Sequence, residues 1–183
     1  TLIDAKRALV NGEAIRKPAQ IIAESASLTL LAAIDYVSRA GHKLAEALDQ
    51  FGELELVGKY CLDVGASTGG FTEVLLRRGA SSVVSIDVGH DQMVTELKDN
   101  PKVTCIEGFN ARELSPQTLA ATGVAKADFD VVVADLSFIS LTLVLEQILS
   151  VAPNADLVLL IKPQFEVGRQ SLSANGIVND YRL

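Results

Sequence analysis

The chain has 183 residues, of which 49% are apolar, and its formal net charge is −7. This length is enough for one domain with a small appendage, and the apolar content excludes a globally disordered chain. The longest apolar runs are about five residues, against the roughly 18 needed to span a bilayer, and no N-terminal segment has the basic-then-apolar pattern of a signal peptide. We therefore expect a cytoplasmic protein that has no membrane partner.

The net charge bears on whether the protein binds nucleic acid, and the two cysteines bear on whether it has a disulfide or a metal site. A negative net charge argues mildly against a nucleic-acid binder, because phosphate contacts need lysine and arginine. The basic residues gather, however, on the N-terminal side, in segments 6–17 and 39–43. Cys61 and Cys105 both lie in strand-like runs, so we expect core thiols and neither a disulfide nor a metal site.

Residues 1–31 differ in pattern from the rest of the chain. Residues 4–10 predict a short helix, and residues 13–16 and 27–30 predict two strands. About 30 residues make a poor independent core, so we interpret this segment as part of a small module. Residues 32–40 would be the linker that follows it.

A regular alternation of helix and strand patterns begins at Gly41 with an amphipathic helix. Five strand-like runs follow, at residues 59–64, 83–88, 103–107, 129–135 and 156–162. Helical patterns lie between several of them, at residues 71–78, 91–98 and 141–150. This alternation predicts an α/β fold, with a mostly parallel Rossmann-like sheet and helices on both faces. Residues 111–126 show no clear pattern, and the residues from 163 onward predict a long loop.

The segment 63–72 is the most informative part of the sequence. It follows an apolar run, contains three glycines and opens a helix, which is where α/β proteins bind nucleotide-like ligands. A dinucleotide fingerprint needs a glycine at position 67, which is a serine here, and the lack of a lysine after the glycines leaves a P-loop unsupported. A glycine turn without these phosphate-binding features suits a nucleoside without phosphates, such as S-adenosyl-L-methionine (SAM).

Polar residues end several of the predicted strands, where doubly wound sheets bind their ligands. Asp87 lies about 22 residues after Gly65, a spacing typical of an acid that accepts hydrogen bonds from ribose hydroxyls. Asn110 is a candidate for contact with an adenine edge, and Asp135 and Lys162 end the fourth and fifth strands. Plainer alternatives stay open: a tight turn for the glycines, a solvated strand end for Asp87, a turn residue for Asn110, a helix cap for Asp135 and a snorkelling lysine at 162.

Four motifs together resemble the TlyA family, bacterial proteins with an S4 domain and an FtsJ-like RNA 2'-O-methyltransferase domain that are often labelled haemolysins. The motifs are, in chain order, Tyr36 to Leu44, Leu62 to Thr72, Asp135 to Ser140 and Ile161 to Glu166. The match runs from about residue 36 to residue 180. Residues 1–31 resemble, more weakly, the second half of an S4 RNA-binding domain.

The resemblance implies roles for individual residues and a division into domains. Lys43, which the pattern alone would make a surface lysine, falls with Asp135 and Lys162 on three positions of the family's Lys-Asp-Lys-Glu catalytic tetrad. The glutamate and the last strands of the sheet are expected beyond residue 183. The residues expected to contact SAM are Asp63, Gly65, Ala66, Ser67, Thr68, Gly69, Gly70, Phe71, Asp87, Asn110 and Asp135. The implied domains are an S4-like segment at 1–31, a linker at 32–40 and an FtsJ-like SAM-dependent methyltransferase domain at 41–183.

The activity that the resemblance implies is methyl transfer from SAM to a ribose 2'-hydroxyl of ribosomal RNA, with ribosomal RNA or ribosomal subunits as partners. Lys162 would accept the hydroxyl proton, Asp135 would orient Lys162 and the methyl group, and Lys43 would position the hydroxyl or a neighbouring phosphate. Three alternatives stay open: a base or amino methyltransferase, a SAM-binding RNA or ribosome-assembly factor without activity and, least favoured, a membrane-lytic protein.

Overall fold

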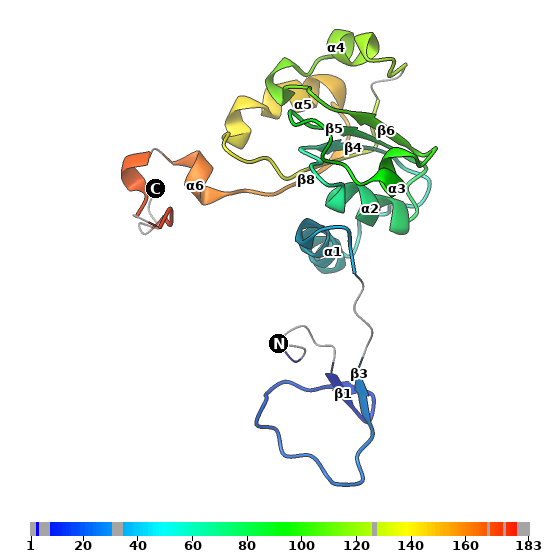
Figure 1. Cartoon of the computed structure of the whole chain (residues 1–183), viewed down its shortest axis with the longest axis vertical. Coiled ribbons are helices and arrows are strands. Elements are labelled where there is room, and N and C mark those ends of the chain that lie inside the picture. Colours follow the sequence, from blue (N-terminus) through cyan, green and yellow to red (C-terminus); the bar gives the residue numbers. More distant parts are fainter. Residues whose placement is uncertain are drawn as a thin grey trace. The chain divides into compact units, whose positions relative to one another are not determined.

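The computed structural model describes residues 3, 8–30, 35–125, 128–167, 169–173 and 175–178. The chain divides into two compact units, Thr1–Asp35 and Tyr36–Leu183 (Figure 1). Within the described ranges, no helix has the length and apolar character needed to cross a membrane. The S4-like character of residues 1–31 and the linker at 32–40 stay predictions, and residues 31–34 lie outside the described part.

The N-terminal unit contains a small antiparallel sheet. Its strands are β1 (Ala8–Val10), β2 (Glu13–Ala14) and β3 (Leu28–Leu30), in the order β2-β1-β3. The helix predicted over residues 4–10 is therefore wrong at 8–10, and residues 4–7 lie outside the described range. The reason is the Asn11-Gly12 pair, which has positive φ angles of 52° and 87° and forms a two-residue hairpin turn between β1 and β2, not a helix end.

The second unit is built on five parallel strands, which confirms the predicted α/β sheet. The strands are β4 (Tyr60–Val64), β5 (Ser82–Ile86), β6 (Val103–Ile106), β7 (Val131–Ala134) and β8 (Asp156–Leu159). Their order is β6-β5-β4-β7-β8, so the chain moves outward from β4 on one side and then returns to pair β7 with β4 on the other. The carboxyl ends of β4 and β7 are thus the switch point, where such sheets bind ligands.

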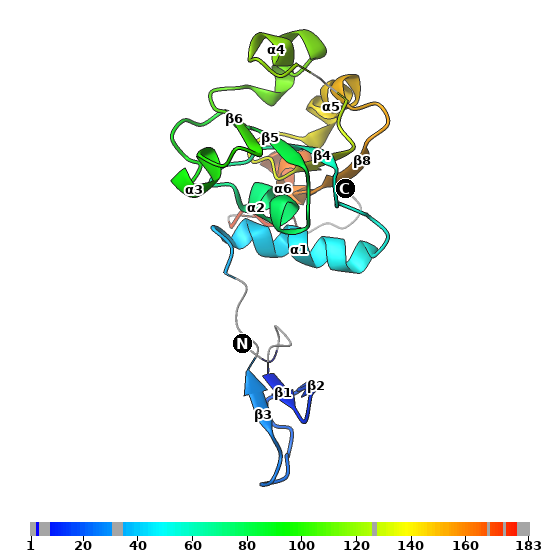
Figure 2. The same cartoon turned by 90° about the vertical axis from the view of Figure 1, so that its right-hand side faces the viewer.

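Helices cover both faces of this sheet (Figure 2). They are α1 (Arg39–Phe51), α2 (Gly70–Arg77), α3 (Thr95–Lys98), α4 (Pro116–Ala121) and α5 (Leu145–Val151). The short helix α6 (Pro163–Glu166) lies apart from the sheet, on the segment that follows β8 (Figure 1). Alternate side chains of β4 enter two separate cores: Cys61 packs with α1 and α2, whereas Leu62 and Val64 pack with α4 and α5. The strand is therefore buried on both sides, and its ligand-binding end is held rigidly.

The two cysteines are free thiols, and the structure places them differently in the sheet. Cys61 on β4 is fully buried, and this burial raises the pKa of its thiol to about 12. Cys105 on β6 is only partly buried, and burial again raises its pKa. Both thiols are thus protonated and unreactive at neutral pH.

Three segments take a form that the sequence did not predict. The helix predicted over 91–98 begins only at Thr95, because Asp91 has a positive φ of 53° and the Glu107 carboxylate accepts the backbone N–H groups of Gln92 and Met93. Residues 111–126 contain the 3-10 turn η1 (Ala111–Glu113) and α4, which begins with a capping box between Ser115 and Thr118. The loop predicted from 163 contains α6 and the 3-10 turn η3 (Arg169–Ser171).

Candidate active site

The glycine turn after β4 brings the backbone of that strand close to the end of β7. Gly65 has a φ of 85°, and a Cβ atom placed there would lie 3.1 Å from the backbone oxygen of Asp135. Gly69 also has a positive φ, of 98°, where it precedes α2. Glycine at 65 is therefore required twice, by the left-handed backbone and by the close approach to β7.

Asp87, at the end of β5, holds the far side of the turn in place. One carboxylate oxygen accepts the backbone N–H of Ser67 at 2.8 Å, and the other accepts that of Gly89 at 2.7 Å. Because each carboxylate oxygen has two acceptor positions, Asp87 can still accept hydrogen bonds from a ligand.

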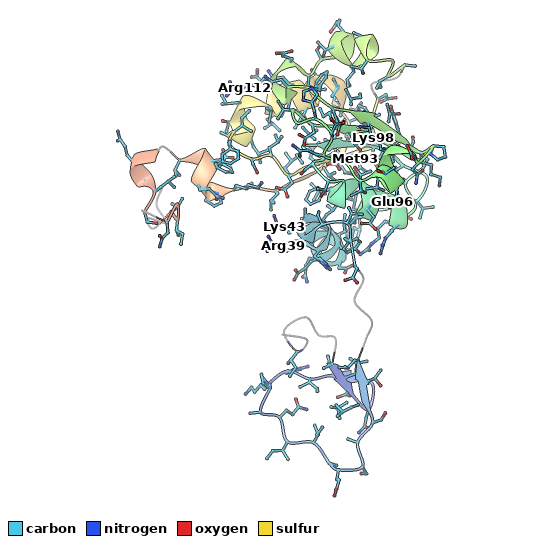
Figure 3. The ribbon with its side chains drawn as sticks, in the orientation of Figure 1. Arg39, Lys43, Met93, Glu96, Lys98 and Arg112 are labelled. Carbon is cyan, nitrogen blue, oxygen red and sulfur yellow. The ribbon has the colours of Figure 1, made fainter. Side chains whose placement is uncertain are left out.

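A cleft of about 600 Å³, here called the Asp87 cleft, opens beside this carboxylate. Phe109 and Leu136 form apolar parts of its wall, and Asn110 lines it as predicted. The Asn110 side chain also accepts the backbone N–H of Arg112 at 3.1 Å and caps η1. The turn role that the sequence left open for Asn110 is therefore real, and it fixes the side chain at the edge of the cleft. Figure 3 labels Arg112 beside this turn.

A second cleft, of about 490 Å³, lies between the start of α1 and the ends of β4, β7 and β8. We call it the lysine cleft, because Lys43 and Lys162 both line it. Figure 3 shows Arg39 and Lys43 projecting together from α1. The two clefts share four lining residues: Gly65, Ser67, Asp135 and Ser137.

Three of the residues predicted to be catalytic lie together in the lysine cleft. The Nζ atom of Lys162 is 2.5 Å from Oδ1 of Asp135, and the Nζ atom of Lys43 is 3.5 Å from Oδ2 of the same carboxylate. The side chains of Asp135 and Lys162 are 12% and 17% exposed, whereas that of Lys43 is 52% exposed. One largely buried carboxylate thus lies between two lysine side chains, one enclosed and one open to solvent.

The predicted SAM-contacting residues separate into two groups. Eight of the eleven line a cleft: Gly65, Ala66, Ser67, Thr68, Phe71, Asp87, Asn110 and Asp135. Asp63, Gly69 and Gly70 line neither. A Cβ atom on Gly70 would meet the side chain of Ser38 and the backbone of Gly41, so Gly70 permits the close contact of α2 with α1.

Asp63 lies entirely inside the protein, behind the glycine turn. Its Oδ2 atom accepts a hydrogen bond of 2.6 Å from the Thr72 hydroxyl, which in turn lies 2.7 Å from the Ser85 hydroxyl. Burial, opposed by the hydrogen bond from Thr72, raises the pKa of Asp63 to about 7. This group of side chains connects β4, α2 and β5, so Asp63 supports the turn and does not reach the cleft.

Sequence reasoning missed Ser137 and Arg39. The Ser137 hydroxyl accepts a hydrogen bond of 2.7 Å from Lys162, and Arg39 lines the lysine cleft at the first position of α1. Their spacings carried a signal, since Ser137 lies two residues after Asp135 and Arg39 lies one helical turn before Lys43.

Glu166 was also missed as a structural tie between loops. Its carboxylate accepts the Ser140 hydroxyl at 2.5 Å and the backbone N–H of Leu141 at 3.0 Å. These bonds join α6, which directly follows Lys162, to the loop that follows Asp135. No local pattern indicates them, because the partners are 25 and 26 residues apart.

Comparison with known proteins gives consistent results. The family model of the FtsJ-like methyltransferases matches residues 36–181. The chain is 44% identical over 185 residues to the 16S/23S rRNA (cytidine-2'-O)-methyltransferase TlyA of Mycobacterium tuberculosis. The alignment covers 100% of this chain and 66% of that protein. It is 41% identical over 172 residues to Hemolysin A of Brachyspira hyodysenteriae, covering 93% of the chain and 69% of that protein.

A solved structure of a proposed hemolysin from Streptococcus thermophilus has the same fold. It superposes with a TM-score of 0.72 at 36% sequence identity, covering 97% of this chain and 64% of that one. The chain thus spans about two thirds of the length of the relatives it matches. By sequence and by structure, the chain belongs to the FtsJ-like methyltransferase family, and its TlyA and hemolysin relatives confirm the resemblance seen in its motifs.

Proposed function

We propose that this protein transfers a methyl group from SAM to a ribose 2'-hydroxyl of ribosomal RNA. The observation that carries the proposal is the arrangement of Lys43, Asp135 and Lys162 in a cleft that adjoins the glycine turn. A base or amino methyltransferase has no need of an enclosed lysine at the acceptor. The names of the relatives, which include rRNA (cytidine-2'-O)-methyltransferase, point to the same acceptor.

SAM is the cofactor that this family uses, and the residues present fit it. The turn lets a nucleoside approach the backbone at Gly65, and Asp87 retains acceptor positions for ribose hydroxyls. Carboxylates at 87 and 135 disfavour a phosphate and favour a cation. When bound, SAM supplies a methyl group that its positively charged sulfur has already activated.

The residues of the lysine cleft would then orient the acceptor hydroxyl and remove its proton. Lys162 is the proposed base: the proton of the 2'-hydroxyl moves to Nζ as the oxygen forms its bond to the methyl carbon. Asp135 holds Nζ in place through its 2.5 Å contact. Lys43 is half exposed, so it is suited to hold the incoming ribose or an adjacent phosphate.

Binding of the RNA is proposed to involve basic residues other than Lys43 and Lys162. Arg39 extends the positive charge of the lysine cleft along α1. The N-terminal unit, with Arg16 and Lys17 in its described part, is proposed to contact RNA backbone as an S4-like module. Such phosphate contacts predict an affinity that falls as salt concentration rises. We infer that the protein acts on ribosomal RNA or ribosomal subunits in the cytoplasm.

The test is transfer of labelled methyl from SAM to ribosomal subunits of a strain that lacks the enzyme, followed by alkaline hydrolysis of the RNA. Alkali cleaves through a free 2'-hydroxyl, so a 2'-O-methyl group leaves the label in an uncleaved dinucleotide. Label in dinucleotides supports the proposal. Label in mononucleotides would move the target to a base, and SAM binding without any transfer would favour a non-catalytic factor.

A further inference from the structure

We infer that Ser137 is a positioning residue for the base: it holds the Lys162 side chain so that one face of its nitrogen is left for the acceptor hydroxyl. This inference rests on the proposed function. Ser137 follows Asp135 by two residues on the loop after β7, and it lines both clefts. Its hydroxyl lies 2.7 Å from Nζ of Lys162 and accepts a hydrogen bond from it.

The chemistry of an amine explains why two contacts are needed. A neutral lysine nitrogen has two N–H bonds and one lone pair, and only the lone pair accepts a proton. A single contact with Asp135 fixes the position of Nζ but leaves it free to rotate about that contact. The hydrogen bond to Ser137 occupies one N–H, and the Asp135 carboxylate lies 2.5 Å from the same nitrogen as an ion pair, so the two contacts together leave one direction of the tetrahedral nitrogen for the lone pair.

The surroundings of Ser137 argue against a role in folding. Ser137 is exposed, and its one hydrogen bond in the described structure goes to Lys162. Substitutions at exposed positions usually change the free energy of unfolding little. The charged groups that face Lys162 are Asp135, at the end of β7, and Lys43, from α1, which reaches the other oxygen of Asp135.

The experiment compares Ser137→Ala and Ser137→Thr in the full chain, with Ser150→Ala as the matched control. Ser150 is an exposed serine on α5 whose hydroxyl donates to the backbone oxygen of Gln147, so its removal costs a similar bond outside the site. The measurements are kcat and KM for methyl transfer to ribosomal RNA, the dissociation constant of SAM, the melting temperature and the dependence of kcat on pH.

Ser137→Ala is expected to lower kcat by roughly 10- to 100-fold, since misplacement of a reacting group by about 1 Å costs on this order. SAM affinity and melting temperature should match those of Ser150→Ala, the dependence of kcat on pH should change, and Ser137→Thr should restore most of the rate. Unchanged kcat in Ser137→Ala would overturn the inference. Equal losses in the Ala and Thr variants, together with weaker SAM binding, would also overturn it, because they identify Ser137 as a ligand contact. If the wild-type protein transfers no label to ribose, the result would contradict the proposed function on which this inference rests.

Discussion

Asp63 and Asp135 lie at the ends of two neighbouring strands, yet they have opposite surroundings. Asp63 on β4 is fully buried, accepts one bond from the Thr72 hydroxyl and forms no ion pair with a cation in the described part of the chain. Asp135 after β7 lies in the lysine cleft between Lys43 and Lys162. The difference teaches that an acid at a strand end in this fold has two uses: facing inward it supports the turn, and facing the cleft it pairs with the lysines that the proposed mechanism uses.

Removal of the base should have the largest effect. We expect Lys162→Ala to lower kcat by about 10² to 10⁴, the usual contribution of general base catalysis, while the affinity for SAM stays unchanged. The measurement is methyl transfer under saturating SAM and RNA. Lys59→Ala is the control, because Lys59 pairs with Asp130 at 3.7 Å and lines neither cleft. More than a tenth of the wild-type rate in Lys162→Ala would contradict the role of the lysine cleft.

The buried carboxyl group of Asp63 should make the stability of the protein depend on pH. Burial raises the pKa of Asp63 from an ordinary 3.8 to about 7, so the folded protein favours the protonated form. The contribution of Asp63 to stability is therefore fully present below pH 3.8 and is lost as pH rises through about 7.

Asp63→Asn carries no charge and should lack this loss. The free energy of unfolding is measured by urea titration between pH 4 and 8. The difference between the variant and wild type should increase by a few kcal/mol in favour of the variant from pH 4 to pH 8. The Asn variant should also retain its SAM affinity, because Asp63 lines neither cleft. Parallel curves for the two proteins would show that Asp63 is not desolvated as the structure describes.

Substitutions in the glycine turn should distinguish an effect on protein stability from an effect on SAM binding. Gly65→Ala should destabilise the protein by about 1–3 kcal/mol through backbone strain and should weaken SAM binding as well, since Cβ would press on the Asp135 backbone. Gly123→Ala is a matched control: its φ is 91°, but nothing lies within 4 Å of the added atom. Calorimetry should find both variants destabilised and only the first defective in SAM binding.

The smallest effect is expected at Glu107, whose side chain is 13% exposed and pairs with the half-exposed Lys98. The hydrogen bond from Lys98, followed by the backbone N–H of Gln92, lowers its pKa to about 2. Its contribution to stability is therefore present above about pH 4.5 and is lost as pH falls through about 2. Wild type and Glu107→Gln should differ slightly in urea midpoint at pH 6, and their midpoints should converge toward pH 2. A difference that stays constant with pH would show that the substitution acts through altered packing and not through charge.

The sheet was predictable because its signal is local. Each strand is a short apolar run with polar residues at its ends, and the glycine turn after β4 is contiguous in sequence. The helix over 4–10 failed at 8–10 because the Asn11-Gly12 hairpin brings in β2 and β3 as partners that the local pattern does not contain. Strand pairing of this kind overrides the high intrinsic helix propensity of alanine and leucine.

The site was predictable only in part. Strand-end position and family resemblance pointed to Asp135 and Lys162, and these side chains do lie together. The hydrogen bond from Lys162 to Ser137 spans 25 residues, and the bonds that Glu107 accepts from Gln92 and Met93, which shorten α3, span 15 and 14. The sequence also does not distinguish the inward-facing Asp63 from the cleft-facing Asp135, because that depends on which face of the sheet α2 covers.

The position of Asp135 between two lysine nitrogens has a consequence for the electrostatics of methyl transfer. On the proposed mechanism, the proton that reaches Lys162 replaces, on nitrogen, the positive charge that sulfur loses with the methyl group. The total charge enclosed by the cleft is therefore the same before and after the reaction, and only its location changes. A carboxylate already fixed at 2.5 Å from the nitrogen faces the new cation without moving. The surrounding dipoles then need little reorganisation, which is a condition for a low barrier.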